Sequence, residues 1–327
     1  MFNGFVDWVL DRTILFSFDR SGFLRHARNF RPSDIAMDLA GRVCLVTGAN
    51  SGIGRAAATA LAARGAEVWL LCRDRARGEE AVASIREMTA NQRVQLEVLD
   101  MSHLAAVRAF AARFAPTRVD LLIHNAGVLP ATREETAEGV ELTLATNVIG
   151  PFLLTHLLHA KLAAADGARV IFVSSGGMYA QRLSLDDLEW TQRPFDGVTA
   201  YAQTKRMQVI LTELLARRWA RAGIAVHAMH PGWADTPSVR SSIPRFWRLM
   251  RTRLRTPEQG ADTLVWLAVA PPTALPSGQF WLDRTPQPTH LRPFTVEPPR
   301  DRARLWRLCT RLAGLAQPSD DARRAQA

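Results

Sequence analysis

Short apolar segments alternate with helical segments along most of the chain, and this alternation constrains the fold more than any other feature of the sequence. The apolar runs are too short for helices, and most are followed by a segment with helical spacing. The expected strands are 43–46, 68–72, 94–99, 119–124, 169–173 and 225–230, and the expected helices are 55–64, 79–88, 104–114, 139–163, 201–222 and 259–268. Such units form right-handed crossovers and a parallel sheet covered on both faces. The sequence therefore predicts an α/β fold with a doubly wound parallel sheet.

The composition is that of a globular chain with one large core. The 327 residues are 47% hydrophobic and 22% charged. A single domain is expected over residues 41–290, with an aromatic and basic N-terminal extension over 1–40 and an Arg/Pro-rich tail over 291–327. Cys44, Cys72 and Cys309 are isolated, with no C-x-x-C and no His cluster at metal-ligand spacing. We expect no disulfide, no structural metal and a reducing, cytoplasmic environment.

The formal charge of +10 could indicate nucleic acid, a membrane surface or an anionic ligand. The arginines are scattered rather than gathered in a stripe, and no nucleic-acid-binding motif accompanies them, so no nucleic-acid partner is expected. The apolar runs are too short to span a bilayer, and the first residues lack the pattern of a secretory signal. A soluble chain is expected, with peripheral membrane contact through its termini left open.

Both termini carry patterns of amphipathic helices. In the N-terminal extension, Phe5, Trp8, Val9 and Arg12 have helical spacing, and the apolar face could pack on the same protein or on a membrane surface. In the tail, the last ten residues are expected to be disordered. A second helix is expected there from Leu305, Trp306, Leu308 and Leu312.

Two features precede the last expected helix. Thr256, Pro257 and Gln259 form a capping box with proline at the first helical position, which predicts the start of a helix. Residues 235–255 before it show no strong period and contain several arginines. A long irregular insert at the carboxyl end of a strand commonly shapes a ligand site.

A glycine-rich turn stands between the first strand and the first helix. Its glycines lie where a backbone must approach a pyrophosphate at a helix N-terminus, and this context favours dinucleotide binding over a merely tight turn. The candidate cofactor-binding residues of this turn are Gly48, Asn50, Ser51, Gly52, Ile53 and Gly54.

The end of the second strand indicates which cofactor would bind. It reads Cys72-Arg73, with no carboxylate where an NAD-specific fold places one for the ribose 2′-hydroxyl. An arginine there can bind a 2′-phosphate, so NADP(H) is favoured over NAD(H). The alternative is a solvated arginine, paired with Asp74 next to it.

Polar and small residues follow the next strands at the same expected edge of the sheet. Asp100 after the third strand could accept the adenine amino group, and small residues after the fourth would let a ribose approach. The fourth-strand candidates are Asn125, Ala126 and Gly127. Ser175 after the fifth strand could hydrogen-bond a substrate oxygen. Asn147 lies in a mostly apolar helix, where a buried amide must be hydrogen-bonded, either for packing or for chemistry.

Tyr201 and Lys205 are four residues apart, although the chain has only two residues of each type. On a helix this spacing places both side chains on one face. A phenol titrates near 10, so acid–base work near neutral pH needs a shift of roughly two units, and a neighbouring cation shifts the pKa in that direction. A helix-surface pair without function is the alternative.

Taken in order, the glycine turn, Asn125-Ala126-Gly127, Asn147, Ser175, the Tyr201/Lys205 pair and Pro231-Gly232 resemble the short-chain dehydrogenase/reductase family, over about residues 41–290. The resemblance implies a Rossmann fold that binds NAD(P). It implies that Tyr201 is the acid/base, that Lys205 lowers its pKa and binds the nicotinamide ribose, and that Ser175 donates to the substrate oxygen.

The same resemblance implies further roles. Asn147 would hold a proton-relay water, Pro231 and Gly232 would lie against the cofactor, and Thr236 would contact it near the nicotinamide. The chain has His124 where the family often has Asn, which leaves Asn125 as the matching position. The residues between Ser175 and Tyr201 are more numerous than in the shortest members and are expected to form a flap over the substrate.

The predicted activity is NADP(H)-dependent interconversion of a carbonyl and a secondary alcohol. Phe195, Trp233, Phe246 and Trp247 lie on segments expected to line the pocket, which favours an apolar small-molecule substrate. A homo-oligomer is compatible with the sequence. The alternatives are a non-catalytic NADP(H)-binding regulator, which would be expected to lack Tyr201 or Lys205, and a membrane-peripheral scaffold.

Overall fold

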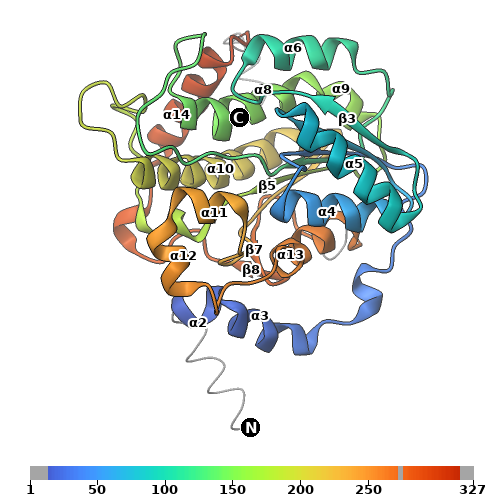
Figure 1. Ribbon diagram of the computed structural model, residues 1–327. Helices are drawn as coiled ribbons and strands as arrows, with labels where there is room; N and C mark the ends of the chain where they lie inside the picture. The colour runs from blue at the N-terminus through green and yellow to red at the C-terminus, as the bar shows by residue number, and fades with distance from the viewer. Residues whose placement is uncertain (1–13, 272–274, 317–327) are drawn as a thin grey trace.

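The computed structural model describes residues 14–271 and 275–316, and its centre is one mixed sheet between two layers of helices (Figure 1). The strand order is β3-β2-β1-β4-β5-β6-β7-β8, with every neighbouring pair parallel except β7 and β8. The strands are β1 (Val43–Thr47), β2 (Glu67–Cys72), β3 (Val94–Val98), β4 (Leu121–His124), β5 (Arg169–Val173), β6 (Ala225–Met229), β7 (Phe280–Leu282) and β8 (Thr285–Gln287). The predicted doubly wound α/β fold is confirmed.

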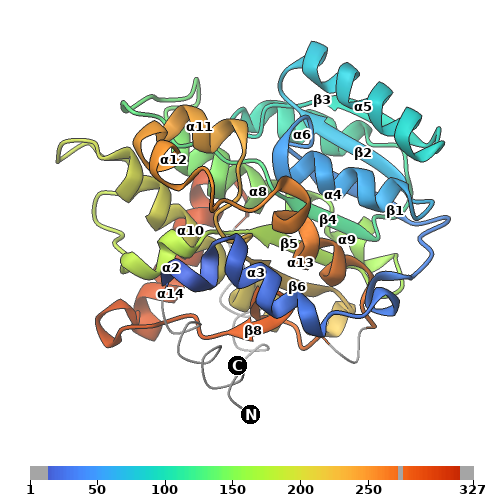
Figure 2. The same cartoon turned by 60° about the horizontal axis from the view of Figure 1, so that its bottom comes forward.

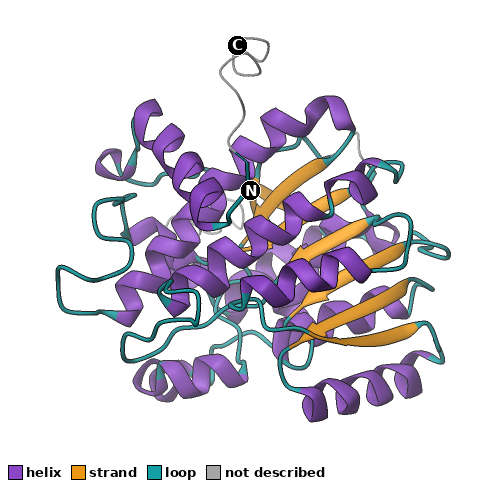
Figure 3. Ribbon diagram, turned by 90° about the horizontal axis from the view of Figure 1, so that it is seen from above, coloured by secondary structure: helices purple, strands orange, loops and turns teal. Residues whose placement is uncertain are grey.

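Helices cover both faces of the sheet, as the view in Figure 3 shows. One face is covered by α4 (Gly52–Ala62), α5 (Arg75–Thr89) and α13 (Pro257–Val269). The other is covered by α6 (Leu104–Arg113), α8 (Gly150–Leu157), α9 (His159–Ala163), α10 (Gly197–Trp219) and α14 (Pro299–Leu312). Because side chains alternate along a strand, β1 supplies both cores: Val43 and Leu45 face one, and Cys44 and Val46 the other.

Side-chain caps fix where several helices begin. Asp74 accepts from Arg77 N at the start of α5, and Asp196 accepts from Thr199 N at the start of α10. The predicted capping box of α13 is confirmed, since Thr256 and Gln259 bond each other's backbone amides. The predicted tail helix is confirmed as α14, which begins at Pro299.

Two of the predicted elements were wrong in detail. The single helix expected over 139–163 is divided into α7 (Leu142–Leu144), the π-helical turn η3 (Ala145–Ile149), α8 and α9. Gly150 packs so closely on the carbonyl oxygen of Met101 that a Cβ would lie 1.9 Å from it, and this packing accompanies the irregular turn. The insert expected to be irregular contains two short helices, α11 (Pro237–Ser242) and α12 (Pro244–Met250), each started by a proline.

The residues between Ser175 and Tyr201 begin with a short 3₁₀ helix, η4 (Gly176–Ala180), and continue irregularly to Asp196. Apolar side chains anchor this irregular stretch in the core, namely Leu183, Leu185, Leu188 and Trp190. A flap over the substrate therefore stays a prediction, and only part of the stretch could move freely.

The N-terminal segment lies on the outside of the sheet's β6–β8 end. Its helices α2 (Ile14–Phe18) and α3 (Arg20–His26) run beside α13 and below α11 and α12 (Figures 1 and 2). The helix expected over Phe5 to Arg12 lies outside the described residues, as does the end of the tail. Among the described helices, none is long and apolar enough to cross a bilayer.

Candidate active site

The carboxyl ends of β1, β4 and β5 bring the predicted site residues to one edge of the sheet, where the strand order reverses between β1 and β4. Open α/β sheets bind ligands at such a point. The loops that follow these strands carry the glycine turn, Asn125 and Ser175, and α10 crosses beside them with Tyr201 and Lys205.

The glycine turn is shaped by close backbone packing. Gly48 and Gly52 have φ of +65° and +54°, a region that favours glycine. A Cβ on Gly54 would lie 2.4 Å from Asn125 Nδ2, so only glycine lets α4 approach the β4 loop. The first amides of α4 have no acceptor within the helix and carry the positive end of its dipole. This turn fits a pyrophosphate, as the sequence predicts.

Asn125 and Ala126 are held against the glycine turn rather than left free. Both backbone amides donate to Thr47 Oγ1, at 3.0 and 2.9 Å, and Asn125 Nδ2 donates to the carbonyl oxygens of Thr47 and Gly48. Thr47, which ends β1, thus ties the two loops together. Its role was not predicted, although a threonine at a buried strand end is a readable signal.

Lys205 is a buried cation with few partners. It is 2% exposed, and Nζ donates to the carbonyl oxygen of Val173 at 2.8 Å. A Cβ on Gly127 would lie 3.4 Å from Nζ, so this glycine leaves space beside the ammonium. Burial lowers the pKa of Lys205 to about 7. An ammonium has three N–H donors, which leaves capacity to bind hydroxyl groups.

Tyr201 lies beside Lys205, with Nζ 5.3 Å from the centroid of its ring. Burial and a hydrogen bond with Ser175 shift the pKa of Tyr201 in opposite directions. Burial is the larger effect, and the pKa is raised to about 12. The net direction is opposite to the one expected from a neighbouring cation. The physical reason is that burial disfavours both charged forms, the phenolate and the ammonium.

Asn147 lies within the π-helical turn and is fully buried. Its Nδ2 donates to Val128 O and Thr204 Oγ1, its Oδ1 accepts from Val128 N, and its backbone oxygen accepts from Gln208 Nε2 at 2.7 Å. Asn147 therefore joins α10 to the β4 loop, and Gln208 is a partner that sequence reasoning missed.

Ser175 caps η4, with Oγ accepting from Gly177 N at 3.2 Å. Ser174 instead points into the structure and donates to the carbonyl oxygen of Lys205. The structure thus separates the two serines, and only Ser175 contacts Tyr201.

The remaining candidates lie around this centre. Arg73 is exposed, and its neighbour Asp74 caps α5 rather than pairing with it. Asp100 Oδ1 accepts from the amide and hydroxyl of Ser102. Thr236 caps α11 and lies near the glycine turn, since a Cβ on Gly52 would be 3.1 Å from its methyl group.

The aromatic candidates form two groups. Trp233 and Phe246 pack edge to face at 5.3 Å, and Trp247 Nε1 donates to Asp235. Phe195 packs edge to face on Trp190, and both lie on the stretch between Ser175 and Tyr201.

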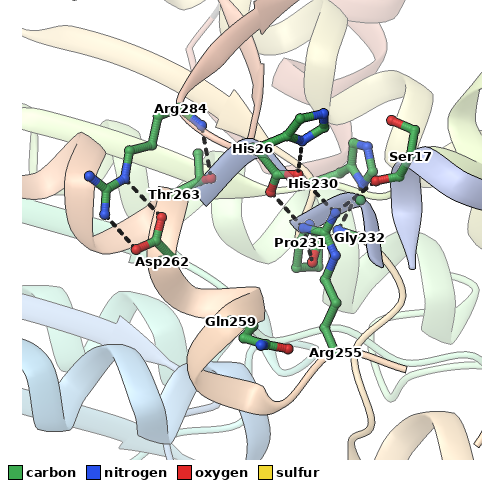
Figure 4. Close-up of polar contacts among 12 residues, drawn as sticks. Ser17, His26, His230, Pro231, Gly232, Arg255, Gln259, Asp262, Thr263 and Arg284 are labelled. Carbon is green, nitrogen blue, oxygen red and sulfur yellow. Dashed lines mark hydrogen bonds and ion pairs between the residues drawn. The ribbon is translucent and has the colours of Figure 1, made fainter. Parts of the chain in front are cut away.

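A second set of buried polar residues, unpredicted, surrounds Pro231 and Gly232 (Figure 4). Arg255 is 1% exposed and forms hydrogen bonds with both carboxylate oxygens of Asp283 and with the carbonyl oxygens of Ser17, Asp19 and Pro231. His26 Nδ1 lies 2.7 Å from Asp283. We call these residues, Arg255, Asp283 and His26, the Arg255 cluster.

The sequence profile of the short chain dehydrogenases matches residues 42–245. The chain belongs to this family. Short-chain dehydrogenases are similar to it over most of its length: bovine dehydrogenase/reductase SDR family member 12 is 46% identical over 278 residues, covering 84% of this chain and 86% of the relative. Human retinol dehydrogenase 13 is 38% identical over 296 residues, covering 85% and 86%.

Solved structures agree with this assignment to the short-chain dehydrogenases. An uncharacterised protein from Mycobacterium paratuberculosis has a TM-score of 0.69 and 31% identity, covering 86% of this chain and 96% of that one. A short-chain dehydrogenase from Escherichia coli CFT073 in complex with NADPH has a TM-score of 0.61 and 26% identity, covering 78% and 100%. The chain is an oxidoreductase that acts on CH–OH groups, and its fold binds a nicotinamide cofactor.

Proposed function

We propose that the protein interconverts a carbonyl and a secondary alcohol with NADP(H), and that Tyr201 transfers the proton. The observation that carries this proposal is the position of Tyr201 on α10, with its ring centroid 5.3 Å from the ammonium of the buried Lys205, next to the loop that holds Ser175. A donor pair of this kind can hold one substrate oxygen from two sides.

When bound, the nicotinamide cofactor supplies or accepts the hydride. In the reducing direction Ser175 and Tyr201 polarise the carbonyl by hydrogen bonds, and Tyr201 then gives its proton to the forming alkoxide. Lys205 keeps donors available for a ribose hydroxyl, and its charged form favours the phenolate that remains. In this proposal Asn147 holds a water molecule that relays the proton, as the family resemblance implies.

The cofactor preference rests on Arg73. Asp74 uses its carboxylate to cap α5, so the exposed guanidinium of Arg73 is available to a 2′-phosphate. The related E. coli dehydrogenase was solved with NADPH, which supports the same choice.

The proposed substrate is an apolar carbonyl or alcohol. Trp233 and Phe246 pack together beside Thr236, and Trp247 is fixed by Asp235 on the same segment. A relative that covers most of this chain is named a retinol dehydrogenase, and retinol is an apolar alcohol. Phe195 packs on Trp190, on the segment between Ser175 and Tyr201.

Tyr201→Phe tests the proton-transfer role. General acid–base catalysis contributes on the order of 10²- to 10⁴-fold, so NADPH-dependent reduction across a carbonyl panel should fall by that factor while NADPH binding persists. Tyr179→Phe is the matched control, because that hydroxyl donates to the carbonyl oxygen of Pro288 and should leave turnover in place. Unchanged activity in Tyr201→Phe would refute the role. NADPH binding without turnover in the wild type would favour a regulator.

Arg73→Glu tests the cofactor preference. A hydrogen bond to a charged group contributes about 1.5–3 kcal/mol, so the Kd for NADPH should rise roughly 10- to 100-fold while the Kd for NADH changes little. Arg93→Glu makes the same charge change at the opposite edge of the sheet and should leave both constants as they are. Equal losses for both cofactors would contradict the assignment.

A further inference from the structure

The N-terminal segment contacts the two loops that frame the proposed active site. Residues 17–20 lie against the loop that follows β6, which contains Pro231, Gly232 and Trp233. Figure 2 shows α2 and α3 crossing below α11 and α12, the two helices that continue this loop. The segment is therefore packed on the site rather than on a distant surface.

Backbone hydrogen bonds join three parts of the chain at this place. Trp233 N donates to Phe18 O at 2.8 Å, Arg255 N donates to Trp233 O at 2.8 Å, and Arg20 N donates to Arg253 O at 2.7 Å. The β6 loop thus lies between the N-terminal segment and the residues just before α13. Trp233 is thus hydrogen-bonded to the N-terminal segment on one side and to Arg255 on the other, and Ala234 forms a β-bridge with Arg255. Thr236 follows two residues later.

The side chain of Phe18 connects this loop to the catalytic serine. The ring is 6% exposed and lies 4.3 Å from the ring of His230 and 6.1 Å from that of Trp233. On its other side is Gly176, where a Cβ would come within 2.4 Å of Phe18 Cε2. Phe18 therefore fills the space between the loop after β5, which holds Ser175, and the loop after β6.

Arg255 holds the N-terminal segment through its backbone. It donates to the carbonyl oxygens of Ser17 and Asp19, on either side of Phe18, while Asp283 neutralises it (Figure 4). The fit around it is tight: a Cβ on Gly232 would lie 2.3 Å from Arg255 Nε and 2.6 Å from Phe18 O. Glycine at 232 is thus required by its φ of +70° and by the close approach of Arg255 and of Phe18 O.

The turn that holds Asp283 is itself constrained. Asp283 and Arg284 both have positive φ, +47° and +60°, which is the geometry of a two-residue hairpin turn and is disfavoured for residues other than glycine. Contacts compensate for this conformation: Arg284 forms a bidentate pair with Asp262, and its amide donates to Thr263. The acceptor for Arg255 is therefore rigidly placed.

We propose that residues 14–26 act as a clamp on the active site, with Phe18 and Arg255 as positioning residues. The clamp fixes the distance between Ser175, on one loop, and Thr236, on the other. The idea rests on the proposed function, in which Ser175 holds the substrate oxygen and Thr236 lies near the nicotinamide. Phe18 acts through Gly176 and Trp233 and touches neither substrate nor cofactor.

The test compares Phe18→Ala with Leu24→Ala in the full chain. Leu24 belongs to the same segment but is 50% exposed on α3. Amide hydrogen exchange is followed in peptides covering 175–180 and 231–236, together with kcat and KM for carbonyl reduction. Displacing a reacting group by about 1 Å can cost on the order of 100-fold. Phe18→Ala should speed exchange in both peptides and lower kcat roughly 10- to 100-fold.

Leu24→Ala should leave exchange in these peptides and kcat unchanged. Phe18→Leu, which keeps a large apolar side chain, should restore much of both readouts. If the alanine variant does not fold, Phe18→Val replaces it in the comparison; its smaller side chain should still speed exchange in both peptides. If the Phe18 variants lose stability but leave exchange and kcat unaltered, the segment is only a cover and the clamp is refuted.

The two proposals fail in different ways. If the wild type reduces no carbonyl in the panel but Phe18→Ala still speeds exchange in both loop peptides, the proposed function is wrong and the positioning contact stands. If the wild type is active and exchange in both peptides is unaffected by Phe18→Ala, the clamp is wrong and the proposed function stands.

Discussion

Two buried cations, Lys205 and Arg255, lie at different loops around the site, and their surroundings differ sharply. Lys205 donates to one carbonyl oxygen, that of Val173, and burial lowers its pKa to about 7. Arg255 makes five hydrogen bonds and an ion pair with Asp283. A guanidinium has five N–H donors, so Arg255 has none left for a ligand.

This difference separates a buried cation that is able to bind a ligand from one that only stabilises the fold. An under-coordinated buried cation is costly for folding but can bind a ligand and change its charge near neutral pH. A fully coordinated one holds the chain in place and has nothing to offer a substrate. Burial and charge alone would not distinguish the two residues; the number of partners does.

The largest effect is expected from removing the saturated cation. Arg255→Met leaves Asp283 as a buried carboxylate without its main partner, which should lower the free energy of unfolding by about 3–5 kcal/mol. Urea denaturation followed by circular dichroism measures it. Arg75→Met, which breaks an exposed pair with Glu79, is the control and should change little. A small loss in Arg255→Met would show that the cluster does not hold the fold.

A double-mutant cycle sharpens the same point. Arg255→Met and Asp283→Asn remove the two partners of one buried pair, so the double variant should lose less than the sum of the single losses. The coupling energy is expected to be about 0.5–3 kcal/mol, from denaturation of all four proteins. Additive losses would mean that the carbonyl acceptors, rather than Asp283, carry the contribution of Arg255.

A third expected effect is a pH dependence caused by Lys205. Its folded pKa of about 7 is below the ordinary 10.5, so the unfolded chain binds more protons between these two values. Stability should therefore rise with pH across this window, with a slope approaching about 1.4 kcal/mol per pH unit from this residue. Below pH 7 the penalty is constant, because both states carry the charge.

Lys205→Met should lose this upward slope and also lose turnover. Lys161→Met is the natural control, since it removes the only other lysine, whose ammonium donates to the carbonyl oxygens of Phe114 and Pro116. The difference in slope between the two variants isolates Lys205 from other titrating groups. Identical pH profiles would show that the Lys205 ammonium is not desolvated in solution.

The side of the molecule around Lys205 could be predicted from sequence because its determinants are local. Each strand is followed directly by its site residues, and parallel strands bring their carboxyl ends to one edge. The glycine turn, Asn125, Ser175 and the Tyr201/Lys205 pair therefore meet as expected. The roles proposed for them stay predictions.

The side around Arg255 could not be predicted in the same way. Its members come from the N-terminal segment, the residue before the capping box and a hairpin turn, and no spacing relates them. Arg255 was one of several arginines in an insert without a period, and its partner Asp283 has no motif. The helices α11 and α12 were missed because they are only 6 and 7 residues long and begin at prolines, too short for an apolar stripe to show.

The π-helical turn at Asn147 marks the limit of periodicity arguments. An apolar stretch from 139 to 163 predicts one helix, but packing of Gly150 on the backbone of Met101 is a tertiary contact that no local pattern encodes. The Tyr201 pKa was similarly beyond the sequence, since the neighbouring cation was visible and the extent of burial was not.

The long reach of the Arg255 cluster has a consequence for biosynthesis. His26 and Asp283 are 257 positions apart, and Ser17 and Arg255 are 238 apart. Since translation proceeds from the N-terminus, the first helices leave the ribosome long before their partners exist. The glycine turn and the Tyr201/Lys205 helix are made in between, so the chemistry-bearing residues are present before the loops that carry them can be locked. A nascent chain that stops before β7 would carry Phe18, Tyr201 and Arg255 but not Asp283, so Arg255 would lack the carboxylate that neutralises it until the last strands are made.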